Sequence, residues 1–256
     1  MMRPLMGSFS ALALIFALGE AAAQSPSPSA GPIRTVLALG RVSGPFQALM
    51  QLNLSRVIIP AGASARYVGV AAMIYLTAGA VVVSTGADRR TIRESEGLHI
   101  PANVETTLEA PADGKTEMLV YRLMPDTNND SVSAIGSPAS STVIHRMKLS
   151  TSLKSGPFEF SMTRVTLPAG ATRPRPHTRT GAALYYVLTE GSITIWPEAT
   201  LETLKGESRT EARPTGTVQE EPYGFIHSWS PIARAALVLL QANISQEGSP
   251  EIIFVK

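Results

Sequence analysis

The chain has 256 residues, of which 44% are hydrophobic and 16% charged, with a formal net charge of +2 and no cysteine. The length allows one large domain or two small ones, and the charged share is below the roughly 25% of typical soluble domains. The lack of cysteine excludes disulfides, thiolate metal ligands and cysteine nucleophiles. Basic residues form only short clusters, such as Arg173, Arg175 and Arg179, so the sequence lacks the basic stripe with interleaved aromatic residues that a nucleic-acid-binding protein needs.

Residues 1–23 are predicted to be a secretory signal peptide. Arg3 gives a positive start, an apolar run extends from about Ala11 to Leu18, and Ala21 to Ala23 provide small residues before the expected cleavage point. The apolar run is shorter than the ~20 residues of a membrane-spanning helix, and Glu20 follows it. We therefore expect a periplasmic or secreted protein without a stable membrane anchor after cleavage.

Two polar segments divide the rest of the chain. Residues 24–33 are rich in Ser and Pro and are predicted to be a disordered tether. Residues 125–141, with the sequence PDTNNDSVSAIGSPASS, are predicted to be a linker. These segments leave 34–124 and 142–256 as two predicted domains.

The two predicted domains repeat the same landmarks in the same order. SGPF begins at Ser43 and Ser155, R-V-x-x-P-A-G begins at Arg56 and Arg164, and two later segments align through Gly79 and Gly191. Landmarks that recur in one order indicate a duplicated domain.

Short β-type runs within each copy are separated by Pro and Gly. Phe158, Phe160 and Met162 alternate with polar residues, as in a half-buried strand. The segment 189–192, Thr-Glu-Gly-Ser, has turn chemistry between two apolar runs, and helical periodicity is scarce. The sequence therefore predicts an all-β protein made of two antiparallel barrels or sandwiches.

The C-terminal copy resembles the cupin superfamily of small jelly-roll barrels, and the duplication resembles the two-domain members of that family. The second cupin motif, G-x5-P-x-G-x2-H-x3-N, matches the residues Gly216, Pro222, Gly224 and His227, with Pro231 in place of the Asn. The resemblance implies two tandem cupin-type jelly-roll β-barrels (a bicupin) after the signal peptide.

The first cupin motif, G-x5-H-x-H-x3,4-E-x6-G, is incomplete in this copy. In cupins that hold a metal, its two His and its Glu bind the ion together with the His of the second motif. Counting back from Gly191 places His177 and Arg179 at the paired His positions and Leu184 at the Glu position. The resemblance thus leaves His177 and His227 as the two remaining metal ligands.

The N-terminal copy keeps the barrel pattern without the ligands. Counting from Gly79 and from Pro101 places four other residues at the ligand positions: Ala65, Tyr67, Ala72 and Thr106. His99 lies two residues before Pro101, off the ligand position. We expect a scaffold barrel without ligand residues.

The substitutions in the C-terminal copy disfavour a bound metal. Two imidazoles alone seldom hold an ion, and the permanent charge of Arg179 would repel a cation. Glu220 or Glu221 could provide a carboxylate, although their spacing does not single them out. We expect no cofactor, with a divalent metal on His177 and His227 as the alternative.

Arg179 suits an organic anion, because a guanidinium offers a fork of donors to a carboxylate. If Leu184 points inward, strand alternation places Tyr186 on the same inner face. We therefore expect His177, Arg179, Tyr186 and His227 to bind a small anionic or hydroxylated molecule.

Other roles stay open for these side chains. His177 could lie on the surface, Arg179 could turn outward to pair with a glutamate, and His227 could be a rim histidine bonded to the backbone. Trp196 and Trp229 are interpreted as packing residues.

Three functions remain. We favour an exported bicupin that binds a small molecule without a fully formed metal site, and we leave enzymatic activity undecided while favouring its absence. The alternatives are a metal-dependent cupin enzyme (dioxygenase, isomerase or lyase) that uses His177 and His227, and a structural or oligomerising barrel without a ligand. Pairing through sheet edges could give a homodimer. No G-x-S-x-G, P-loop or dinucleotide-binding motif is present.

Overall fold

The computed structural model describes residues 31–43, 49–126, 135–149, 157–232 and 234–256. All regular structure in these ranges is β-strand. Within the same ranges there is no helix long and apolar enough to cross a membrane. The predicted signal peptide, most of the Ser/Pro tether and part of the predicted linker lie outside the described residues.

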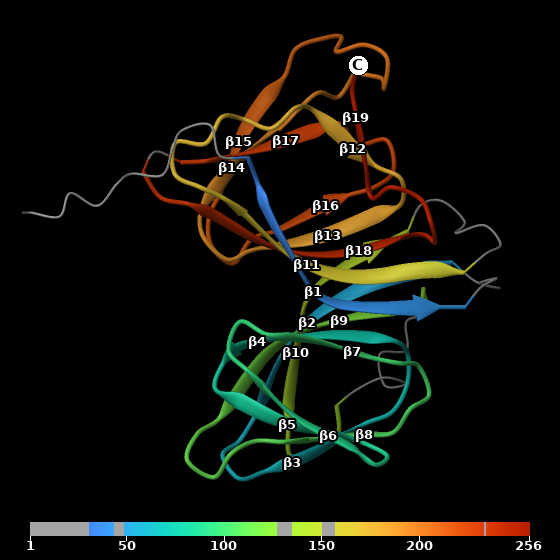
Figure 1. Cartoon of the computed structure of the whole chain (residues 1–256), viewed down its shortest axis with the longest axis vertical. Helices are drawn as coiled ribbons and strands as arrows, with labels where there is room; N and C mark the ends of the chain where they lie inside the picture. Colours follow the sequence, from blue (N-terminus) through green and yellow to red (C-terminus); the bar gives the residue numbers. More distant parts are fainter. Residues whose placement is uncertain (1–30, 44–48, 127–134, 150–156, 233) are drawn as a thin grey trace, which may run out of the picture.

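The N-terminal barrel consists of two antiparallel sheets (Figure 1). The first contains, in spatial order, β10 (Ser140–Lys148), β2 (Met50–Ile59), β9 (Thr116–Pro125), β4 (Ala72–Ala78) and β7 (Gly97–Ile100). The second contains β3 (Ser64–Tyr67), β8 (Thr106–Glu109), β5 (Ala80–Thr85) and β6 (Asp88–Arg93).

The C-terminal barrel repeats this arrangement strand for strand. Its first sheet contains β1 (Ile33–Val42), β11 (Phe158–Leu167), β18 (Leu237–Gln246), β13 (Ala182–Val187) and β16 (Val218–Glu221). Its second contains β15 (Arg209–Arg213), β14 (Gly191–Ile195), β17 (His227–Pro231), β12 (His177–Arg179) and the additional β19 (Ile252–Phe254). The matching strand orders confirm the all-β, two-barrel prediction and give the sequence repeat a structural basis.

The two barrels exchange their first strands. β1 pairs antiparallel with β11 of the C-terminal barrel, with Ile33 opposite Thr166, and β10 pairs antiparallel with β2 of the N-terminal barrel. The domain limits predicted from the sequence, 34–124 and 142–256, therefore do not follow the sheets. Each barrel is completed by a strand from the other part of the chain.

The two first sheets pack face to face and join the barrels (Figure 1). Buried residues from both sheets form one apolar cluster, because each of these sheets is apolar on both faces. Its members include Leu52, Met73, Leu119 and Tyr121 of the N-terminal barrel and Phe160, Leu184, Leu240 and Ile244 of the C-terminal barrel. The interiors of the barrels hold two further apolar clusters, one in each.

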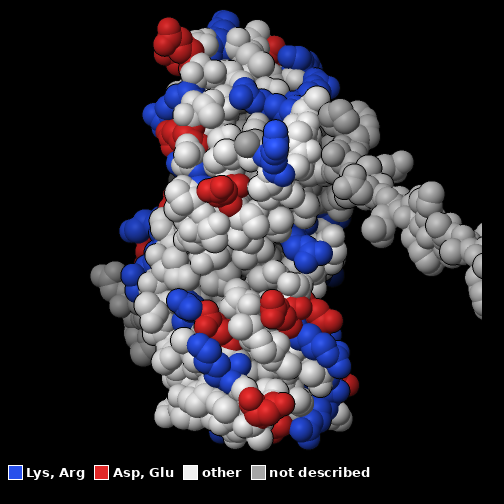
Figure 2. All heavy atoms as spheres, turned by 90° about the vertical axis from the view of Figure 1, so that its left-hand side faces the viewer, with Lys and Arg blue, Asp and Glu red and all other residues white. Residues whose placement is uncertain are grey.

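The surface view agrees with the charge pattern of the sequence. Figure 2 shows Lys and Arg interspersed with Asp and Glu on one face of the molecule, without a continuous basic stripe on that face.

Candidate functional site

His177 and His227 lie directly opposite each other on β12 and β17, inside the C-terminal barrel. Their side chains are buried, and their ring centroids are 4.5 Å apart. Nδ1 of His177 lies 3.0 Å from the Arg175 carbonyl oxygen, and Nδ1 of His227 lies 3.1 Å from the Phe225 carbonyl oxygen. When Nδ1–H donates to the backbone in this way, the ring is held in place and Nε2 is left for the site. The alternative that placed His177 on the surface is therefore wrong.

Arg179 points into the same barrel and is only 1% exposed. Its Nε donates to Oε2 of Glu221 at 3.1 Å, and its Nη2 donates to Oε1 of Gln241 at 3.1 Å and to Oη of Tyr185. The Tyr185 hydroxyl in turn donates to Oε1 of Gln241 at 2.8 Å. The inward orientation expected for a ligand contact is confirmed, and the outward alternative is wrong.

Glu221 provides the carboxylate of the site and is completely buried. Its Oε1 accepts a hydrogen bond from Trp229 Nε1 at 2.8 Å and lies 2.6 Å from His227 Nε2. In the β13–β16 ladder Glu221 stands opposite Ala183, so it reaches the barrel interior from the strand next to the one where the cupin motif has its glutamate. Trp229, interpreted as a packing residue, also binds this carboxylate.

The neighbouring Glu220 points out of the barrel. Its Oε1 lies 2.6 Å from Nε2 of His145 on β10 and links the two barrels at their junction. Of the two carboxylates weighed from the sequence, only Glu221 belongs to the site.

The prediction that Tyr186 lines the site is wrong. Leu184 lies in the apolar cluster between the barrels and Tyr186 packs against that cluster, whereas Ala183 and Tyr185 face the interior of the C-terminal barrel. The count from Gly191 misplaces the glutamate position by one residue, and a one-residue shift moves every side chain of a strand to the other face.

The two copies differ in this stretch. Both ladders have an irregularity at the end of the strand: the β4–β9 ladder shifts register between Leu76 and Ala78, and the N–H groups of Leu188 and Thr189 both donate to the Val238 carbonyl oxygen. The second copy is one residue longer between the interior residue and the glycine, so the count from Gly79 reaches the interior Ala72 and the same count from Gly191 reaches the outer Leu184.

Burial and neighbouring charges set the protonation of the site. Burial, together with the nearby His227 and Arg179, lowers the pKa of His177 to about 4, so its imidazole is neutral at pH 7. Burial raises the pKa of Glu221, but His227 and Arg179 outweigh burial and lower the pKa to about 2. Burial also lowers the pKa of Arg179, and Glu221 opposes that shift. The site therefore combines a neutral imidazole with a guanidinium–carboxylate pair.

Two buried donors in the site have no acceptor. Within the described part of the chain, Arg179 Nη1 and Gln241 Nε2 are buried without a hydrogen-bond partner. Gln241 Oε1 is already crowded, since it accepts from Arg179, Tyr185 and Nη2 of Arg34, the last at 3.3 Å on the exchanged strand β1. Buried donors without a partner are energetically costly, so this part of the barrel is suited to a group with acceptor oxygens.

The residues do not fit a divalent ion as they are placed. No group of three or more His, Asp or Glu in the described ranges is arranged to hold a metal. Both oxygens of Glu221 already have close partners, and Arg179 Nε lies 3.1 Å from Oε2. A cation bound to this carboxylate would lie against a permanent positive charge.

The corresponding positions of the N-terminal barrel carry no imidazole or carboxylate. Ala65, Tyr67 and Ala72 belong to the apolar cluster of that barrel, and Thr106 is buried beside them. The Tyr67 hydroxyl donates to the Val70 carbonyl oxygen at 2.6 Å.

Sequence reasoning missed Tyr185, Gln241 and Arg34. Alternation along the strands could have indicated the first two, since polar Gln241 interrupts the apolar run 236–240. Nothing in the sequence indicated that Arg34 would join the C-terminal barrel.

Comparison with known proteins bears on the fold. No protein-family model and no curated protein matches the sequence. The structure is similar to that of a variant of Bacillus subtilis oxalate decarboxylase, with a TM-score of 0.58 and 12% identity over 90% of this chain and 82% of that chain. It is also similar to the formate complex of Lactobacillus farciminis oxalate decarboxylase, with a TM-score of 0.56 and 13% identity over 89% of this chain and 90% of that chain.

Oxalate decarboxylases are bicupins, and the likeness extends over both barrels of this chain. At this level of identity the likeness concerns the fold, which agrees with the motif in the C-terminal copy. The chain is therefore an all-β protein of two tandem jelly-roll barrels with the fold of the cupin superfamily.

Proposed function

We propose that the chain binds a small monoanionic or hydroxylated organic molecule inside its C-terminal barrel. The observation that carries this proposal is the pair of buried, unpartnered donors, Arg179 Nη1 and Gln241 Nε2, on side chains already joined by a 3.1 Å hydrogen bond. A carboxylate or hydroxyl oxygen can accept from both. Charge-assisted hydrogen bonds of this kind are stronger than neutral ones.

The charges around the site favour a monoanion over a polyanion. Glu221 compensates the charge of Arg179, and both side chains are at most 1% exposed. His177 is neutral at pH 7 because its pKa is about 4. Since little uncompensated positive charge remains, binding would depend on directed hydrogen bonds and on the apolar barrel wall formed by residues such as Leu239 and Val187.

One structural neighbour supports this ligand class. The Lactobacillus farciminis enzyme with a similar fold is described as a formate complex, which shows that a protein of this architecture accommodates a small carboxylate. The proposal for this chain rests on its own donors, because its similarity to that enzyme is limited to the fold.

Isothermal titration calorimetry tests the proposal directly. The full chain is titrated with formate, acetate, glycolate and lactate, alongside the variants Arg179→Lys and Arg175→Lys. Arg179→Lys keeps a cation for Glu221 but removes the Nη1 donor, so we expect binding at least about tenfold weaker. Arg175, whose Nη2 donates to the Val255 carbonyl oxygen, serves as the control. Absence of binding for all four acids, or equal binding by Arg179→Lys and the wild type, would refute the proposal.

A metal-dependent cupin enzyme is the second candidate. It is favoured by the two imidazoles whose Nδ1 atoms face backbone carbonyls, since metal-ligating histidines are commonly oriented in this way. A neighbour with a TM-score of 0.53 and 13% identity is described as having Mn(II) centres. His177 and His227 would be the ligands, and Arg179 would have to leave Glu221.

Export and pairing complete the proposal. The N-terminal segment supports export to the periplasm or the medium, with the signal peptide removed. β1 and β10 each form an edge of their sheets, so pairing through these strands would give a homodimer. A barrel that serves only in such assembly, without a ligand, is the third candidate.

A further inference from the structure

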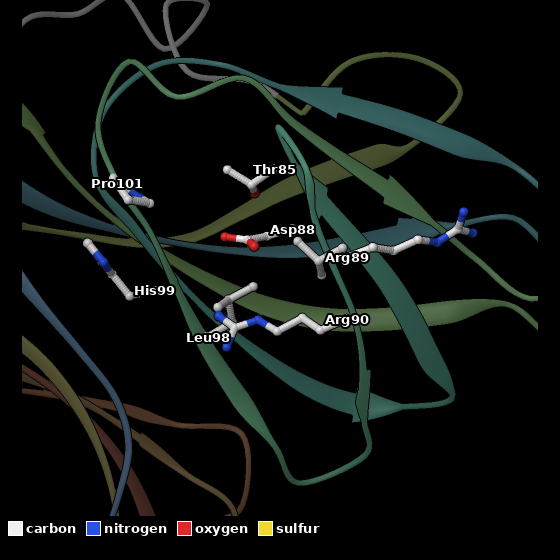
Figure 3. Close-up of a pocket in the computed structure, with 8 residues that line it drawn as sticks. Thr85, Asp88, Arg89, Arg90, Leu98, His99 and Pro101 are labelled. Carbon is white, nitrogen blue, oxygen red and sulfur yellow. The ribbon is translucent and has the colours of Figure 1, made fainter.

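A cavity of about 430 Å³ lies in the N-terminal barrel between β6 and β7, each the edge strand of its sheet (Figure 3). Its volume is within the range of small-molecule sites. Residues that line it include Asp88, Arg90, His99, Val83, Leu98 and Pro101. The interior positions of the cupin motif, Ala65 and Ala72 among them, do not line this cavity.

In the C-terminal barrel a side-chain contact joins the corresponding strands. There Arg213 of β15 donates from Nε and Nη2 to Oε1 of Gln219 on β16, at 3.0 and 2.8 Å. By their places in the ladders, Glu94 corresponds to Arg213 and Leu98 corresponds to Gln219. Neither the donor nor the acceptor of that hydrogen bond is present here, so the two copies differ in the side chains at this edge.

Asp88 and Arg90 bring opposite charges to the cavity. They lie two residues apart on β6, so both side chains project from the same face, and Figure 3 shows both directed toward the cavity. In the described ranges neither side chain forms an ion pair or a side-chain hydrogen bond. The intervening Arg89 also lines the cavity, but its guanidinium extends away from Asp88 and Arg90 (Figure 3). Its Nη2 lies 2.9 Å from Oε2 of Glu109.

His99 also lines the cavity. Its Nε2 is buried and has no hydrogen-bond partner among the residues described. The ring is held against Gly40 of the exchanged strand β1, where an added Cβ would lie 2.3 Å from Nε2 and Cε1. Burial lowers the pKa of His99, so the imidazole is neutral at pH 7 and accepts or donates a hydrogen bond according to its tautomer.

We infer that this cavity binds a small zwitterion, namely an α-amino acid with an apolar side chain. The ammonium group would bind Asp88, and the carboxylate would bind Arg90. Leu98, Val83 and Pro101 provide the apolar wall for the side chain. Asp88 and Arg90 are exposed to solvent, and a ligand with both charges would pair with two groups that form no ion pair among the described residues.

Calorimetric titration of the full chain with L-leucine tests this inference. The comparison ligands are isoamylamine, which lacks the carboxylate, and 4-methylpentanoate, which lacks the ammonium group. We expect L-leucine to bind at least about tenfold more tightly than either, since each lacks one charge-assisted contact. Arg90→Gln should weaken the binding of L-leucine by a similar factor, so that L-leucine no longer binds more tightly than isoamylamine. Asp88→Asn should have the same effect on the difference in affinity between L-leucine and 4-methylpentanoate.

Matched controls keep the test specific. Arg93→Gln removes a guanidinium from the same strand at a residue that does not line the cavity, and it should leave binding unchanged. L-leucine and 4-methylpentanoate carry the carboxylate proposed to bind the C-terminal site, so the titrations are repeated in Arg179→Lys. The preference for L-leucine should persist in this variant, which distinguishes failure of the C-terminal site from failure of this one. The inference is overturned if L-leucine does not bind the wild type, if the two half-ligands bind as tightly, or if neither Asp88→Asn nor Arg90→Gln weakens binding.

Discussion

Arg179 and Glu221 form an ion pair in the interior of the C-terminal barrel, with Nε 3.1 Å from Oε2 and side chains that are 1% and 0% exposed. In the cupin motif the position of Arg179 belongs to a metal-binding histidine. A protein cation thus stands beside the carboxylate where the family resemblance implies an ion. Hydrogen bonds to Tyr185 and Gln241 fix the orientation of the guanidinium.

Removing the carboxylate should destabilise the protein strongly. Glu221→Gln leaves Arg179 buried without a counter-charge, which typically lowers the free energy of unfolding by about 3–5 kcal/mol. The double variant Arg179→Met/Glu221→Gln should recover more than half of that loss, because the buried charge is then absent as well. Chemical denaturation measures both values. A loss below about 1 kcal/mol for Glu221→Gln would contradict the ion pair as described.

Stability should fall as the pH is lowered from about 7 to about 4. The pKa of His177 is about 4 in the folded protein against an ordinary value of 6.5, so the unfolded chain binds this proton first and folding loses stability between these two values. At about 1.4 kcal/mol per pKa unit, the loss attributable to His177 reaches roughly 3 kcal/mol.

The carboxylate extends the decline to lower pH. The pKa of Glu221 is lowered from 4.5 to about 2 in the folded state, so its contribution is complete above pH 4.5 and is lost as the pH falls toward 2. Unfolding measured from pH 7 to pH 3, for the wild type and for His177→Gln, separates the two groups. The variant should lose most of the slope between pH 6.5 and pH 4, and an unchanged slope would refute the assignment to His177.

The neighbouring residues Leu184 and Tyr185 should have separate roles. Leu184→Ala creates a cavity between the barrels and should lower the free energy of unfolding by about 2–5 kcal/mol with little effect on ligand affinity. Tyr185→Phe removes the hydroxyl that contacts Arg179 and Gln241, and it should lower the affinity for the organic acid about tenfold. Denaturation and calorimetry on both variants decide the matter. If Leu184→Ala weakened ligand binding and Tyr185→Phe did not, the inner and outer faces assigned to β13 would be wrong.

The sequence was sufficient to predict the architecture and part of the site. The repeat aligned through Gly79 and Gly191 indicated two equivalent barrels, and the motif spacing brought His177, Arg179 and His227 together correctly. These inferences depend on local patterns that survive within each copy.

The rest of the site depends on pairing between distant strands. Glu221 reaches its partners because β16 pairs with β13. Gln241 reaches the site because β18 pairs with the other edge of β13. Tyr185 was confused with Tyr186 because the repeat spacing changes by one residue. The contribution of Arg34 follows from the exchange of β1, for which no signal in the sequence was recognised.

Converting Arg179 to histidine should create a metal site. Arg179→His restores the H-x-H pair and releases Oε2 of Glu221, so that three imidazoles and one carboxylate surround one point, as transition-metal sites require. After incubation with Mn²⁺ or Zn²⁺ and desalting, we expect close to one ion per chain in this variant. Arg175→His is the matched control and should retain none. If Arg179→His also stays free of metal, the guanidinium does not occupy the place of an ion.

The metal content of the purified wild-type protein tests the central claim most directly. Inductively coupled plasma mass spectrometry on protein prepared without chelators should find Mn, Fe, Ni, Cu and Zn well below one ion per chain, on the order of a tenth or less, because Arg179 takes up the carboxylate that an ion would need. Near-stoichiometric metal that disappears in His177→Ala and His227→Ala would contradict this account and favour the metal-dependent enzyme.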